Sequence, residues 1–221
     1  MIIQEATQNF VVDMDEATRN DLEKKMYIQD ATVRNYATAI ADNNNRYSDD
    51  AMASAWEDLL AAVEAFSRAK NDVTNKIVDP FLKKEGVLTE LSIANYNWNA
   101  DFSNSKLAVT VHDVREADAV PELDKITCPD SYVEEVSMSD YAAVARFLVS
   151  DYLRRNRDIS ITQDAYDSVV AAQADAEREF DQNRDLITRE VVGPYIEEKG
   201  IDPNTSSWTL NYDTKEIVIT H

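Results

Sequence analysis

Residues 66–86 read FSRAKNDVTNKIVDPFLKKEG, and residues 180–200 read FDQNRDLITREVVGPYIEEKG. The two stretches align without a gap at a constant offset of 114, and Phe, Thr, Pro and Gly coincide in the same order. Apolar residues coincide on both sides of the proline. Self-similarity of this kind indicates a duplicated unit. The chain is therefore predicted to contain two diverged copies of one module.

The similarity continues beyond the glycine at an offset of 110, where Trp98 matches Trp208 and Phe102 matches Tyr212. Apolar and polar residues alternate around both tryptophans, a short polar turn follows, and a second alternating segment returns at 107–111 and 217–219. This pattern is typical of a half-buried β-hairpin. A lone hairpin is marginally stable in water. Each hairpin should therefore lie on a helix, pair with the other hairpin in one antiparallel sheet, or pack on a second subunit.

A long helix is predicted before each hairpin. In the first copy, apolar residues recur at spacings of four and three, which is the seam of a helix that packs along another helix; the seam comprises Met52, Trp56, Leu59, Val63, Phe66, Val73 and Ile77, with Lys70 as an interruption. Ser48 and Thr162 are the expected N-caps. Pro80 and Pro194 predict a kink, or a break in which Asp79 caps a new short helix. Gly86 and Gly200 are expected to end the helices in the left-handed conformation.

Shorter helices are predicted before the long ones, at 32–42 and 139–156, and a short strand at 9–13 followed by a helix at 16–27 is predicted near the N-terminus. The expected fold class is α+β, mainly α, with a tandem duplication of a short helix, a long kinked helix and a β-hairpin. The predicted organisation is an N-terminal arm (1–30), module 1 (31–112), an acidic connector (113–137) and module 2 (138–221).

The formal net charge of −20 excludes a nucleic-acid binder that works by neutralising phosphates, because such binding needs Lys and Arg to displace counterions. The charge is densest in the connector, which has eight acidic and two basic residues. One cysteine, no bilayer-spanning apolar run and no signal-peptide pattern at the start predict a protein of the cytoplasm, or of a virion, without membrane contact.

Chemical motifs are scarce in this sequence. Three glycines leave no phosphate loop or dinucleotide fingerprint, and the two histidines, His112 and His221, have no metal-ligand spacing. Both are interpreted as solvated strand ends. Cys128 is interpreted as a small, partly buried residue, and its pairing with His112 is the one nucleophile–base combination worth naming. We therefore expect no cofactor, no metal and no catalytic residues.

Seven aromatic residues are the candidate module anchors or interface residues: Trp56, Phe66, Trp98, Phe102, Phe180, Trp208 and Tyr212. The duplicated tryptophans favour an anchoring role that holds each hairpin on its helix. The alternative is a protein-binding patch, because interfaces are enriched in aromatic side chains.

The duplication, the long seams and the lack of chemical motifs predict a non-catalytic structural or assembly protein that acts through protein–protein contacts, as a homo-oligomer or with a protein partner. A phage-type structural or accessory protein is one setting that fits. The alternative hypothesis is an acidic decoy that occupies the nucleic-acid site of a basic protein, which the net charge motivates.

Overall fold

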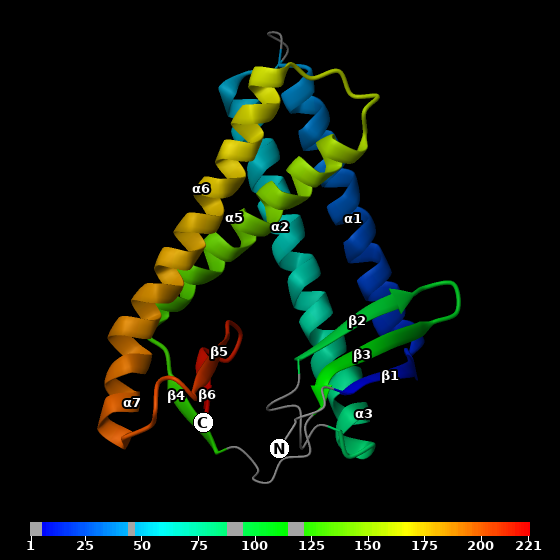
Figure 1. The fold of residues 1–221 in the computed structure, drawn as a ribbon. Helices are drawn as coiled ribbons and strands as arrows, with labels where there is room; N and C mark the ends of the chain where they lie inside the picture. Colours follow the sequence, from blue (N-terminus) through cyan, green and yellow to red (C-terminus); the bar gives the residue numbers. More distant parts are fainter. Residues whose placement is uncertain (1–5, 44–46, 88–94, 115–121) are drawn as a thin grey trace. The chain divides into compact units, whose positions relative to one another are not determined.

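The structure is a computed structural model, and it describes residues 6–43, 47–87, 95–114 and 122–221. The fold is α+β and mainly α, as the sequence predicts (Figure 1). The first copy comprises β1 (Ala6–Asp13), α1 (Glu16–Ala41), α2 (Asp49–Val73), the π-helical turn η1 (Thr74–Val78), α3 (Asp79–Lys84), β2 (Asn95–Asp101) and β3 (Lys106–Val114). The second comprises β4 (Leu123–Thr127), α5 (Asp130–Arg155), α6 (Gln163–Ile187), η2 (Thr188–Val192), α7 (Gly193–Lys199), β5 (Ser207–Asn211) and β6 (Glu216–Thr220).

The offset of 114 extends back to the first residue of each leading helix, because α1 begins at Glu16 and α5 at Asp130. Each has 26 residues, so the helix before α2 or α6 is not short. The predicted division of α1 into helices at 16–27 and 32–42 is wrong. The intervening residues contain no glycine or proline, so nothing in them breaks the helix.

Each hairpin belongs to its own three-stranded sheet, with strand orders β1-β3-β2 and β4-β6-β5. Of the three expected alternatives, the pairing of both hairpins in one sheet is therefore wrong, since β1 and β4 supply the third strands of two separate sheets. β1 pairs antiparallel with β3, with Asn9 opposite Thr110, and the Thr110 hydroxyl donates to Asn9 Oδ1 at 2.9 Å. β4 lies in the segment assigned to the connector, of which 115–121 are outside the described residues.

The turns at the helix ends follow the sequence closely. Ser48 and Thr162 cap α2 and α6, because their hydroxyls accept from the backbone N–H groups three residues later at 3.2 Å. Gly86 and Gly200 have φ values of +75° and +70°. Both caps and both left-handed glycines are therefore confirmed.

The prolines produce a π-helical turn rather than a new capped helix. Asp79 keeps helical backbone angles of −60° and −47°, and its N–H donates to the Thr74 carbonyl, five residues earlier. The wider turn accommodates the ring of Pro80, which in a regular α-helix would clash with the preceding carbonyl. The predicted capping by Asp79 is wrong; its carboxylate instead accepts from the Tyr96 hydroxyl at 2.8 Å.

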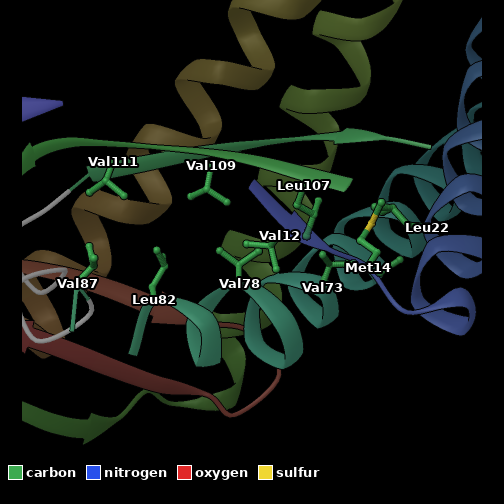
Figure 2. Close-up of a cluster of buried hydrophobic side chains, with 11 residues drawn as sticks. Val12, Met14, Leu22, Val73, Val78, Leu82, Val87, Leu107, Val109 and Val111 are labelled. Atoms are coloured by element: carbon green, nitrogen blue, oxygen red, sulfur yellow. The ribbon is translucent and has the colours of Figure 1, made fainter. Parts of the chain in front are cut away.

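The chain folds into two compact units, and the boundaries between them fall inside α1, inside α2 and at the start of β4. Apart from the last two residues, unit 1 takes the described parts of 1–26 and 66–123, and unit 2 those of 27–65 and 124–219. The core of unit 1 lies between the first sheet and the end of α2 with η1 and α3. Figure 2 shows its side chains, among them Leu107, Val109 and Val111 from β3 and Val73, Val78 and Leu82 from the helical side.

Unit 2 contains two apolar clusters. In the first, the C-terminal part of α1 and the N-terminal part of α2 pack with α5 and α6; its fully buried members include Ala37, Leu59, Val63 and Ala145. The second lies under β6, where Ile217 and Ile219 pack with Cys128, Val133, Val136, Ile187 and Val192. α5 and α6 pack along each other (Figure 1). In the described part of the chain, no helix has the length and apolarity to cross a bilayer.

Candidate functional site

The two duplicated tryptophans make the same contacts in both copies. Trp98 Nε1 donates to Thr74 Oγ1 at 2.9 Å, and Trp208 Nε1 donates to Thr188 Oγ1 at 3.2 Å. Both threonines are the first residues of π-helical turns. Each indole therefore ties its hairpin to the place where the helix widens.

A cation lies over each of these rings. Lys70 Nζ is 5.2 Å from the centroid of the Trp98 ring, and Arg184 Cζ is 5.0 Å from that of Trp208. These distances are within the range of cation–π attraction. Lys70, which interrupts the apolar seam in the sequence, thus contacts the hairpin.

The other candidate aromatic residues divide between the clusters. Phe66 and Phe102 pack half-buried on the core of unit 1. Phe180 and Tyr212 pack half-buried on the cluster beneath β6 in unit 2. Trp56 packs on the other cluster of unit 2, formed by α1, α2, α5 and α6 and called the four-helix cluster below. The candidates thus belong to three clusters, and their role as interface residues stays a prediction.

Tyr212 has a polar partner that its counterpart Phe102 cannot have. Its hydroxyl donates to Asp140 Oδ2 at 2.9 Å. Burial raises the pKa of Asp140, while the hydrogen bond from Tyr212 and the charge of Arg184 oppose that shift. The residue equivalent to Asp140 in the first copy is Met26, so this polar contact belongs to one copy only.

Asp140→Asn should stabilise the protein at neutral pH. Because the carboxyl pKa is raised on folding, the native state binds more protons than the unfolded state above the ordinary Asp pKa of 3.8, and stability falls as pH rises from there through the native pKa. Asparagine cannot ionise, and its carbonyl still accepts from Tyr212. Urea midpoints should be higher for the variant at pH 7 and converge with those of the wild type at the acid end. A lower midpoint at pH 7 would contradict this.

A second polar cluster lies where α1, α2 and α5 pack together in unit 2, and no motif in the sequence indicates it. Arg146 from α5 stacks on Trp56 from α2, with Cζ 3.8 Å from the ring centroid. Its Nη1 donates to the Tyr36 hydroxyl of α1 at 3.3 Å. The rings of Tyr36 and Trp56 are 5.5 Å apart. Three helices therefore meet around one guanidinium.

This cluster borders a groove with a volume of about 440 Å³. Tyr36 and Ile40 line it from α1, Arg146 from α5, and Ala165 and Val169 from α6. The volume lies within the range of small-molecule sites, about 300–1,000 Å³. The groove combines apolar side chains with the polar groups of Asn43, Ser160, Thr162 and Ser168 and with one cation.

Cys128, the candidate nucleophile, lies in a packed environment. Cys128 is fully buried, and burial raises the pKa of its thiol, so it stays protonated. Its N–H donates to Lys215 O at 2.9 Å, as that of Met14, the equivalent residue of the first copy, donates to Ser105 O at 2.8 Å. A methionine at the same place favours a packing role for the thiol.

The histidines each contact one polar side chain. His112 Nε2 is 3.5 Å from Asn97 Nδ2, and His221 Nε2 is 3.3 Å from Asp124 Oδ2. Among the residues that the structure describes, no group of three or more His, Cys, Asp or Glu side chains is placed to hold a metal ion.

Comparison with protein-family models, curated proteins and solved structures finds no match. The two copies of the module can still be compared with each other. Contacts present in both copies, such as those of Trp98 and Trp208, serve the module itself. Contacts present in one copy, such as those of Arg146, are not required by the module fold and are candidates for a specific function.

Proposed function

We propose that this chain is a non-catalytic assembly protein that acts through protein–protein contacts, as a homo-oligomer or with a protein partner. In this proposal it is a structural or accessory protein of the phage type. The supporting observation is an apolar surface on α5. Val144 and Phe147 are 37% and 50% exposed. They are three residues apart and therefore share one face of the helix.

The energetics of this surface favour association. Full burial of an exposed phenylalanine side chain is worth up to about 3 kcal/mol, and Phe147, which is 50% exposed, can gain about half of that. Aromatic side chains are also enriched among the residues that dominate binding energy at interfaces. A helix that carries an exposed Phe and an exposed Val on the same face can pack that face against a second helix.

Phe147→Lys combined with Val144→Glu should abolish self-association, because a partner helix would then have to desolvate two charges. The measurement is the solution mass by light scattering. We expect the wild type at a multiple of 25.0 kDa and the variant at 25.0 kDa. The matched control is Val170→Lys, which alters a side chain that is 42% exposed on α6. A monomeric wild type would contradict the homo-oligomer.

The acidic decoy remains the second candidate, because α6 carries seven exposed carboxylates, which are spread around the helix: Asp164, Asp167, Asp175, Glu177, Glu179, Asp181 and Asp185. The same helix has two arginines, Arg178 and Arg184. Salt distinguishes the candidates. A complex held by these charges should weaken strongly between about 0.1 M and 0.5 M salt, as the screening length shortens. A contact made by Phe147 should persist.

A further inference from the structure

Arg146 is a cation with few partners of its own. A guanidinium has five N–H donors, and within the described chain the hydrogen bond to Tyr36 engages one of them. No described carboxylate lies within ion-pair distance of Arg146, although acidic residues outnumber basic ones 42 to 22. Among the described residues that line the groove, Arg146 is the one that carries a charge at neutral pH.

The arginine is nevertheless held in place. Its guanidinium is stacked on the Trp56 ring at 3.8 Å, and the Tyr36 hydroxyl fixes one edge. A fixed planar guanidinium matches the two oxygens of a carboxylate and can bind them with two parallel hydrogen bonds. The groove therefore presents a preorganised donor rather than a mobile surface charge.

The counterpart positions in the other copy of the module do not repeat this arrangement. At the offset of 114, Arg146 corresponds to Thr32, Trp56 to Val170 and Tyr36 to Ser150. The Thr32 hydroxyl donates to the Ile28 carbonyl of its own helix, and Val170 is 42% exposed. A feature needed for the module itself would be expected in both copies, as the Trp98 and Trp208 contacts are.

We propose that the groove beside Arg146 binds a small organic anion, consisting of a carboxylate on a compact apolar body. The carboxylate pairs with Arg146, and the body packs on Ile40, Ile161 and Val169. The N-cap residue of α6, Thr162, also lines the groove. The proposal goes beyond the assembly function and does not depend on it.

The test uses two probes of nearly the same shape, 2-naphthoate and the neutral 2-naphthamide, with the full chain. Isothermal titration calorimetry should show that naphthoate binds about tenfold more tightly than the amide, because one charge-assisted hydrogen-bond pair is lost. In ¹H–¹⁵N spectra, naphthoate should shift the Trp56 indole signal and leave that of Trp98 unchanged. Equal binding of the two probes, or no shift of Trp56, would overturn the proposal.

Variants locate the site. Arg146→Met should reduce naphthoate binding about tenfold and leave naphthamide binding unchanged. Ala172→Leu should weaken both probes, because it fills the groove without removing the cation. Arg178→Met is the matched control, since Arg178 lies on α6 with an exposed ion pair to Asp175. Should Arg146→Met fail to fold, Ala172→Leu decides, and unchanged naphthoate binding there would refute the site.

Discussion

Replacing Leu59 by alanine should lower the free energy of unfolding by about 3 kcal/mol, since truncating a buried leucine loses its transfer free energy and leaves a cavity. Leu59 has no exposed surface and lies in the four-helix cluster of unit 2 with Ala37, Val63 and Val149. The measurement is urea unfolding followed by far-ultraviolet circular dichroism, with linear extrapolation to water.

Val170→Ala is the control for Leu59→Ala, because Val170 is a partly exposed aliphatic residue on a neighbouring long helix. Its effect should stay within about 0.5 kcal/mol. A comparable loss in both variants would contradict burial as the cause of the effect at Leu59. A loss below about 1 kcal/mol for Leu59→Ala would mean that the site collapses around the smaller side chain.

Replacing either duplicated tryptophan by alanine should cost about 2–3 kcal/mol, somewhat less than for a fully buried ring because both are half-buried. Trp98→Ala removes the packing on the unit 1 core and the hydrogen bond to Thr74, and Trp208→Ala removes the equivalent contacts. The same urea experiment measures both losses.

Phenylalanine at these two positions distinguishes the contribution of aromatic packing from that of the indole N–H hydrogen bond. Trp98→Phe and Trp208→Phe keep most of the packing and lose the bond to the threonine hydroxyl, so each should cost about 1 kcal/mol. Because the contacts are the same in both copies, the two positions should show the same order of effects. A phenylalanine variant as unstable as the alanine variant would contradict the anchoring role of the ring.

The repeat and its local signals are predictable from the sequence because they depend on neighbouring residues. The N-caps at Ser48 and Thr162 and the left-handed Gly86 and Gly200 are predicted correctly. So is the burial of Leu107, Val109 and Val111 on one face of the returning strand. In each case the information lies within a few residues, as a side-chain oxygen, a missing Cβ or an alternation of polarity.

The errors have a common physical cause in long-range packing. The sequence predicts two helices in place of α1, and the boundary between the two compact units falls close to the expected break, at Met26 and Tyr27. Leu22 packs in the core of unit 1, whereas Val33 packs in that of unit 2. Leu22 and Val33 are eleven residues apart, about three helical turns, so one continuous helix contributes the same face to both cores.

The sequence by itself determined that the chain is a duplication, which residues of each copy correspond, and where α2, α6 and the two hairpins lie. Only the tertiary structure decided that β1 and β4 complete two separate sheets, since the Asn9–Thr110 pairing joins residues far apart in the chain. It alone placed Arg146 between Trp56 and Tyr36. Periodicity and caps reflect the local conformation of a segment, whereas the partner of an edge strand or of a guanidinium is selected by packing between distant segments.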